Sequence, residues 1–272
     1  MPTLSDLTDK GFEILFVSHA RSILEGEFGE TLGELASVLD TLELPITEII
    51  GSGGGESKFT QRMRRELAAL GWTKHNFEIA KVVDGVQKES TSHEVDHVRR
   101  VDGIGVIACE IEWNNKDPFF DRDLENFKRL HAEGAISVGI IITRGSSLQR
   151  ALREAVHRFA TDRGIESYVD LEAHGYTPTP KQRNNVLKRV ERARDPIPFV
   201  AAWTDNFVSN KYGMATTHWD KLIHRVDRGV GNPCPLLLIG LPDTIIRFDS
   251  APVEELGEDD VSDDPVTAAD EE

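Results

Sequence analysis

The fold class is decided by residues 105–143, where two apolar stretches enclose a predicted helix. Residues 105–113 read GVIACEIEW, and residues 136–143 read ISVGIIIT. The second stretch is a continuous β-branched run, which is typical of a strand that is buried on both faces. A helical pattern lies between them at 122–132, and another follows over 147–161, opened by a serine cap. The order strand, helix, strand, helix predicts an α/β domain with a mixed central sheet flanked by helices.

The rest of the chain extends this core on both sides. The predicted flanking elements are helices over 8–24, 28–42 and 56–70, a strand over 76–83 that ends at an Asp-Gly hairpin signal, and a late core strand over 236–241. We therefore expect three parts. These are an N-terminal helical extension (1–50), a main domain (51–248) that begins with a glycine-rich joint, and a disordered tail (249–272).

Composition narrows the classes of protein that fit. The formal net charge is -16, but the tail holds 11 acidic residues and no Lys or Arg, so residues 1–248 carry about -5. No apolar stretch is long enough to span a bilayer, and no signal peptide is visible. Cys109 and Cys234 are the only cysteines, which excludes a disulfide framework and favours a reducing cytoplasm.

Two acidic side chains on the strand 105–113 form the strongest candidate site. Because side chains alternate along a strand, Glu110 and Glu112 share one face, and Ile111 and Trp113 point into the core. A solvated face of an amphipathic strand is the alternative. A turn at Asp102-Gly103 would bring Asp96 beside Glu110 and make a third carboxylate available. Such oxygen ligands suit Mg²⁺, which activates water in phosphodiester hydrolysis.

A rival motif overlaps these residues. His93, Glu94 and His97 match H-E-x-x-H, the signature of zinc metalloproteases. Three observations speak against it. An acid, Asp96, lies inside the motif, two arginines follow it, and a glycine and a β run leave room for little more than two helical turns.

The stretch 110–117, followed by 120–124 and the strand 136–144, resembles the BglII-type restriction endonucleases of the PD-(D/E)xK superfamily. The resemblance implies a restriction-endonuclease-like core with Asp96 as the motif aspartate, Glu110 as the first strand acid, and Glu112 in the usual lysine position, as in BamHI-like enzymes. Asp96, Glu110 and Glu112 would then be catalytic and bind the metal. The connection from Asp96 to Glu110 is longer than in the compact family pattern, so Asp102 is a second candidate for the motif aspartate.

Further candidates lie outside the acidic strand. Glu56 falls on the apolar stripe of the predicted helix 56–70 and is a candidate accessory catalytic acid. The alternative is a first-turn Glu whose negative charge is stabilised by the helix dipole. The basic segment 181–194 and the polar segment 207–228 are candidates for DNA contacts, or else solvated charged surfaces. The predicted DNA-binding residues are Lys116, Lys188, Arg189, Arg192, Lys211, Tyr212, Thr217 and His218.

The resemblance implies a Mg²⁺-dependent type II restriction endonuclease that cleaves duplex DNA at a short palindromic site, and the three carboxylates agree with a metal-dependent nuclease. The resemblance further implies a homodimer, and such an enzyme works beside a DNA methyltransferase. Two alternatives stay open: a repair or modification-dependent nuclease on the same fold, and a catalytically inactive DNA-binding module.

Overall fold

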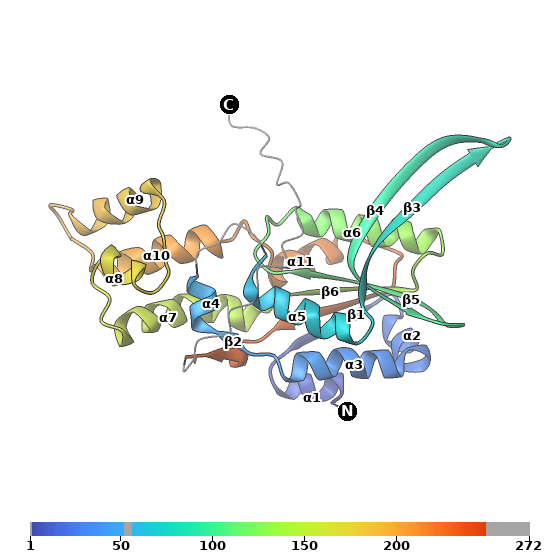
Figure 1. Ribbon diagram of the computed structural model, residues 1–272, viewed down its shortest axis with the longest axis horizontal. Helices are drawn as coiled ribbons and strands as arrows, with labels where there is room; N and C mark the ends of the chain where they lie inside the picture. The colour runs from blue at the N-terminus through green and yellow to red at the C-terminus, as the bar shows by residue number, and fades with distance from the viewer. Residues whose placement is uncertain (1, 52–55, 249–272) are drawn as a thin grey trace.

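A six-stranded sheet forms the centre of the structure, a computed structural model that describes residues 2–51 and 56–248 (Figure 1). The strands are β1 (Glu13–Val17), β2 (Leu44–Pro45), β3 (Thr73–Val83), β4 (Val86–Val101), β5 (Gly105–Glu112), β6 (Val138–Arg144), β7 (Leu236–Leu241) and β8 (Ile246–Arg247). The order in the central sheet is β1-β7-β6-β5-β4-β3, and β2 pairs with β8 apart from it. β5, β6 and β7 are parallel, whereas β1, β4 and β3 join by antiparallel pairing. The predicted mixed α/β sheet flanked by helices is confirmed.

Helices cover both faces of this sheet. They are α1 (Leu4–Asp9), α2 (Ala20–Glu27), α3 (Gly29–Asp40), α4 (Ile46–Ile50), α5 (Lys58–Ala69), α6 (Phe119–Ala132), α7 (Ser146–Asp162), α8 (Tyr168–Glu172), α9 (Pro180–Val190), α10 (Phe199–Lys211), α11 (Trp219–Asp227) and the 3-10 turn η1 (Asp243–Ile245). In the described part of the chain, none of these helices has the length and apolar character that a membrane crossing needs.

The core is divided by the central strands into two apolar layers. Every residue of β6 and β7 is buried, as a strand covered on both faces requires. One layer contains α6 and α11, which pack against Ala108 and Ile141. The other contains most of the remaining helices, packed against Ile107 and Ile140. Ala108, Glu110 and Glu112 of β5 share one face, so the acidic side chains point to the layer that contains α6.

A glycine sets how closely α6 approaches the sheet. A Cβ on Gly139 would lie 2.4 Å from Cδ2 of Phe127, so only glycine leaves room for that ring on β6. Phe127 belongs to the buried stripe of α6, together with Phe120, Leu124 and Leu130. The close contact fixes the helix over β6, which pairs with the strand that carries the acidic residues.

The N-terminal region departs from the prediction. The helix expected over 8–24 is wrong, because α1 ends before Gly11, which has φ +97°, and β1 follows. Apolar residues such as Phe12 and Phe16 fit a short strand as well as a helix. β1 pairs with β7, so the segment 1–50, expected as a helical extension, contributes an edge strand to the central sheet.

The start of α7 also differs from the expectation. Its N-cap is Gly145, which offers no side chain, in place of the predicted serine cap. The carboxylate of Glu13 on β1 accepts hydrogen bonds from the Ser146 backbone N–H (2.5 Å) and from its hydroxyl (2.9 Å). A negative group at a helix N-terminus satisfies free N–H groups and suits the helix dipole. The edge strand thus stabilises a helix far away in the sequence.

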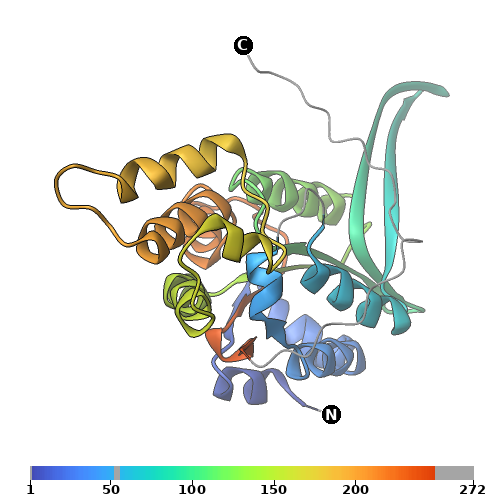
Figure 2. The same ribbon diagram turned by 60° about the vertical axis from the view of Figure 1, so that its left-hand side comes forward.

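The hairpin formed by β3 and β4 extends beyond the body of the protein (Figures 1 and 2). Its turn is the predicted one, since Asp84 and Gly85 both have positive φ. All residues from 81 to 90 are exposed. The expected flexible joint at 51–55 and the expected disordered tail at 249–272 lie outside the described residues, except for Gly51.

Candidate active site

Strand pairing brings Asp96 and Glu110 together. β4 and β5 pair antiparallel, with His97 opposite Cys109 and Val98 opposite Ala108. The ladder ends at His97, so Asp96 and Glu110 are the next residue of each strand, and the charge of Asp96 raises the pKa of Glu110. Asp102 lies in the exposed turn between the two strands, at the far end of this ladder from Glu110. Of the two aspartates considered from the sequence, Asp96 is therefore the one beside the strand acids.

A β-bulge lies at the same point of β4. His75 pairs with Val95 and Thr73 pairs with Val98, so two residues of β4, Asp96 and His97, face a single residue of β3. Bulges change the direction in which side chains point, and they are common next to active sites. Asp96 is exposed on one side here, whereas His97 is buried on the other.

Glu110 and Glu112 are buried on the face that the alternation predicts, with exposed fractions of 6% and 3%. The side chain of Asn115 donates a hydrogen bond to Glu112 Oε2 (2.9 Å), and Thr143 donates one to the Glu112 carbonyl (2.7 Å). The alternative of a solvated strand face is therefore wrong, because both carboxyl groups are removed from water.

Two neighbouring residues of α6 complete the cluster, and the sequence reasoning missed both. Asp123 is 2% exposed, and its Oδ2 atom has no hydrogen-bond partner among the described residues. Arg122 Nε donates to Asp123 Oδ1 (2.8 Å), and Arg122 Nη2 lies 3.7 Å from Glu112 Oε1. The signal was present in the helical pattern, because Asp123 occupies the apolar stripe of α6 between Phe120 and Phe127.

Burial and mutual repulsion perturb these acids strongly. Burial, and then the nearby charge of Asp123, raise the pKa of Glu112 to about 9. Burial, followed by Asp123, Asp96 and Glu112, also holds the pKa of Glu110 well above its usual range. Burial raises the pKa of Asp123 as well, whereas Arg122 lowers the pKa of all three carboxyl groups. Such a cluster favours a bound cation, because a positive charge stabilises the ionised acids.

The donor chemistry of this cluster fits Mg²⁺, which prefers carboxylate oxygens. The buried Oδ2 of Asp123 has no hydrogen-bond partner among the described residues, so it is available to a cation even though Arg122 pairs with Oδ1. Within residues 2–51 and 56–248, no three His, Cys, Asp or Glu side chains are gathered into a ready metal-binding group. Binding a cation would therefore require the carboxyl groups to turn toward one another.

Glu56 lies near this cluster but not where the helical pattern placed it. The helix begins at Lys58 with Ser57 as its N-cap, so Glu56 precedes the helix and is not on its apolar stripe. It forms an ion pair with Arg64 (3.4 Å). Burial and then the charge of Asp96 raise its pKa, while Arg64 lowers it, and the effect of Asp96 shows that the two acids are close.

The zinc protease hypothesis is wrong. His93, Glu94 and His97 lie on the strand β4, where four residues span about 13 Å, whereas the motif needs a helix to bring both imidazoles to one metal. His97 is buried, and its Nδ1 lies 3.3 Å from the Cys109 carbonyl oxygen.

Of the predicted DNA-binding residues, three are buried and a fourth, Lys211, is half-buried. Lys211 donates to the carbonyl oxygens of Ile49 (3.0 Å) and Gly51 (2.7 Å), and burial lowers its pKa to about 8. The hydroxyl of Tyr212 donates to the same Ile49 carbonyl (3.1 Å). Thr217 and His218 are 0% and 1% exposed. These four side chains support the fold in this conformation, and a polar or aromatic pattern alone did not reveal their burial.

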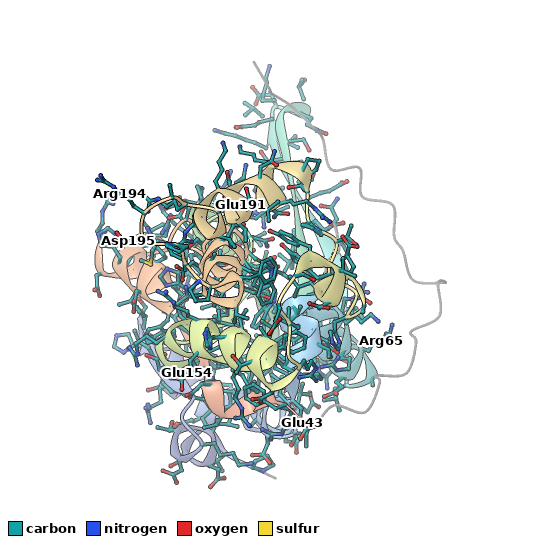
Figure 3. All side chains as sticks on the ribbon, turned by 90° about the vertical axis from the view of Figure 1, so that its left-hand side faces the viewer. Glu43, Arg65, Glu154, Glu191, Arg194 and Asp195 are labelled. Carbon is teal, nitrogen blue, oxygen red and sulfur yellow. The ribbon has the colours of Figure 1, made fainter. Side chains whose placement is uncertain are left out.

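The other predicted DNA-binding residues are at the surface. Lys116, Lys188 and Arg192 are exposed, and the loop after α9 presents Glu191, Arg194 and Asp195 at its outer side (Figure 3). Arg189 differs from its neighbours because it donates to Asp205 Oδ2 (2.8 Å). Its charge is already paired within the protein.

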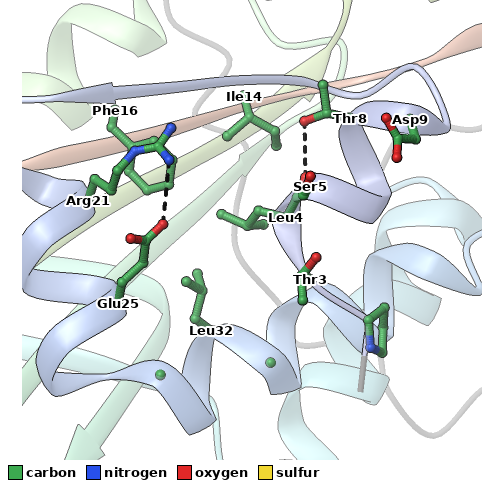
Figure 4. A pocket seen from close by; sticks show the side chains of 13 residues that line it. Thr3, Leu4, Ser5, Thr8, Asp9, Ile14, Phe16, Arg21, Glu25 and Leu32 are labelled. Carbon is green, nitrogen blue, oxygen red and sulfur yellow. Dashed lines mark hydrogen bonds and ion pairs between the residues drawn. The ribbon is translucent and has the colours of Figure 1, made fainter.

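A cavity of about 590 Å³ lies elsewhere, between α1, β1, α2 and α3 (Figure 4). Its lining includes Leu4, Ile14 and Phe16 and the ion pair between Arg21 and Glu25 (3.6 Å). None of the clustered acids lines it. We therefore place the chemistry at the acidic cluster, which has the reactive groups, and not in this cavity.

A mixed sheet with an aspartate opposite an acid-x-acid strand defines the restriction-endonuclease-like class of nucleases. Comparison with known families agrees, since the family model described as Restriction endonuclease BglII/BglIII matches residues 12–241. The chain belongs to this family and is a type II site-specific restriction endonuclease that acts on DNA. The match begins at the residue before β1, so the N-terminal edge strand is part of the family's common region. No curated protein matches the chain.

Proposed function

We propose that the protein is a Mg²⁺-dependent endonuclease that cleaves both strands of duplex DNA at a short palindromic site. The observation that carries the proposal is the cluster at the end of β5. Asp96 and Glu110 directly follow the last pair of the β4–β5 ladder, and Glu110 and Glu112 are both buried. Asp96 and Glu110 would hold the ion, with Glu112 beside them, and Mg²⁺ would supply water activation and charge neutralisation.

The side chains of the cluster have separate tasks in this mechanism. In hydrolysis a water oxygen bonds to phosphorus, the bridging P–O bond breaks, the water loses a proton and the departing oxygen gains one. Asn115 holds one oxygen of Glu112, which fixes the orientation of the carboxylate. In that orientation Glu112, once a cation in the cluster favours its ionised form, could accept the proton that the water loses. Glu56, close to Asp96, is the accessory acid of the proposal.

Duplex cleavage also motivates the proposed homodimer. One protomer carries one acidic cluster, whereas two strands must be cut. A two-fold symmetric dimer matches the symmetry of a palindromic site and places one cluster on each strand. Sizing combined with light scattering tests this directly, and a protein that cleaves both strands while remaining a monomer would contradict it.

The remaining parts of the proposal concern the setting and the DNA contacts. A cytoplasmic enzyme of this kind requires a partner DNA methyltransferase that protects the host's own sites. The exposed residues Lys116, Lys188 and Arg192 are the proposed phosphate contacts.

Glu110→Ala provides the decisive test of the proposal. The variant should lose cleavage in Mg²⁺ while it still binds DNA in Ca²⁺, because it removes a metal ligand without removing phosphate contacts. Cleavage is followed on a plasmid, and binding is followed by gel shift. Glu125→Ala is the matched control, since this acid lies on the neighbouring helix and pairs with Lys128 (3.1 Å). Cleavage by Glu110→Ala at the wild-type rate would refute the site.

A further inference from the structure

The guanidinium of Arg122 makes three contacts, two with the acidic cluster and one with an aromatic ring. Its Nε donates to Asp123 Oδ1 (2.8 Å), its Nη2 lies 3.7 Å from Glu112 Oε1, and its centre lies 4.4 Å from the centroid of the Phe119 ring. The ring contact is a cation–π interaction, which favours a guanidinium over an uncharged group. An arginine fixed on three sides is oriented before any ligand arrives.

The same guanidinium is still open to solvent. The side chain of Arg122 is 54% exposed, whereas those of Glu112 and Asp123 are 3% and 1% exposed. Arg122 therefore lies at the boundary between the buried acids and the outside of the protein. Among the described residues, no acceptor bonds its Nη1 atom. This leaves part of the planar fork of N–H donors available to a ligand.

The negative charges of the cluster explain why binding of a DNA phosphate would need this arginine. When ionised, Asp96, Glu110, Glu112 and Asp123 carry four negative charges, and a DNA phosphate adds another. A single divalent cation offsets only two of these. Further negative charge develops on the phosphoryl oxygens during hydrolysis, and catalysis of this reaction depends mainly on stabilising it. The strand itself carries Glu112 and no basic residue next to Glu110.

We propose that Arg122 is a catalytic residue that donates hydrogen bonds to the scissile phosphate, and that Asp123 is the positioning residue that holds it there. This inference rests on the proposed nuclease function of the cluster. Arg122 remains protonated throughout, so it contributes charge and hydrogen bonds and transfers no proton. The site thereby obtains from the first turns of α6 the positive charge that β5 does not provide.

The position of Asp123 supports this division of roles. It lies on the buried stripe of α6, where an apolar residue would be more stable, and it bonds Arg122. The tight contact between Phe127 and Gly139 fixes this helix above β6, the strand next to β5. The distance from Arg122 to the acids is thus set by the packing of α6 and not by a mobile loop.

Arg122→Ala tests the proposal by single-turnover cleavage at saturating DNA. The rate should fall about 10²-fold, the usual cost of removing one hydrogen-bond donor to a developing negative charge. Added guanidinium at millimolar concentration should restore part of the loss, because it can occupy the vacated position. The cleavage rate of Arg122→Lys should lie between those of the wild type and Arg122→Ala, since lysine keeps the positive charge but lacks the planar pair of N–H donors. Arg129→Ala is the matched control, as this exposed arginine of the same helix donates a hydrogen bond to Asn126 (3.1 Å) and to none of the clustered acids.

Metal binding without DNA gives a second readout that is independent of cleavage. Terbium luminescence titration of Arg122→Ala should show binding at least as tight as in the wild type, because a cation that competes for Glu112 and Asp123 has been removed. A circular dichroism melt confirms that the variant is folded.

Several outcomes would overturn the proposal. Cleavage by Arg122→Ala within a few-fold of the wild type would do so. The proposal would also fail if Arg122→Ala is folded, is not rescued by guanidinium, and loses no more of the cleavage rate than Arg122→Lys does. Weakened terbium binding would make Arg122 a structural support of the metal site instead. If Glu110→Ala also cleaves at the normal rate, the nuclease site itself is wrongly placed. If Glu110→Ala loses cleavage and Arg122→Ala does not, the proposed site stands and only the role of Arg122 is refuted.

Discussion

The buried carboxyl group of Glu112 should make the metal-free protein less stable as the pH rises. Its pKa is about 9 in the folded protein, against an ordinary value of 4.5. Between these two values the unfolded chain has lost the proton and the folded protein keeps it. The free energy of unfolding then falls by about 1.4 kcal/mol for each pH unit. From pH 6 to pH 8 the loss from this one group is about 2.7 kcal/mol.

Urea denaturation in EDTA at pH 6, 7 and 8 measures this effect. Glu112→Gln cannot ionise, so its stability should depend less steeply on pH than that of the wild type, by roughly one proton. Adding Mg²⁺ should also reduce the slope in the wild type, because the cation favours the ionised acids. Glu125→Gln is the matched control, since this acid is solvent-accessible and should keep the wild-type slope. Equal slopes for wild type and Glu112→Gln would refute the reasoning.

Two further predictions follow from the positions of the candidate residues. Asp96→Asn should slow cleavage at least about 10²-fold, whereas Asp102→Asn should leave it near the wild-type rate, since Asp102 lies in the exposed turn. Rate measurements that gave the reverse order would reassign the aspartate. Lys188→Ala with Arg192→Ala should flatten the dependence of DNA affinity on salt by close to one counterion for each contact. Arg189→Ala should leave that slope unchanged, because Arg189 is paired with Asp205; a flatter slope in this variant would contradict the pairing.

The strands that carry the acids could be predicted because two short-range patterns specify them. The β-branched run at 136–143 and the alternation along 105–113 gave the right strands and the right face for Glu110 and Glu112. The turn before β5 then placed Asp96 within reach. Each of these inferences needs only neighbouring residues, which is why the sequence alone was sufficient.

The remaining parts of the site depend on contacts between distant segments. The helix α6 was expected, but its packing onto the sheet through Phe127 and Gly139 of β6 was not, so Asp123 and Arg122 were missed. The polar residues Lys211 and Tyr212 looked like surface residues because their carbonyl partner, Ile49, is 162 and 163 positions away. Burial of a polar side chain cannot be read from its own segment when the group that satisfies it lies so far along the chain.

The position of β7 has a consequence for the order in which the chain can fold. β7 lies between β1 and β6 and is the last strand of the sheet in the sequence. During synthesis, the edges of β1 and β6 that pair with β7 therefore stay unpaired until residues 236–241 have left the ribosome. Contacts of such large sequence separation form slowly, and unpaired edges promote aggregation in the meantime. We expect nascent chains that stop short of β7 to depend on chaperones, and the complete sheet to form only after nearly all of the protein has been made.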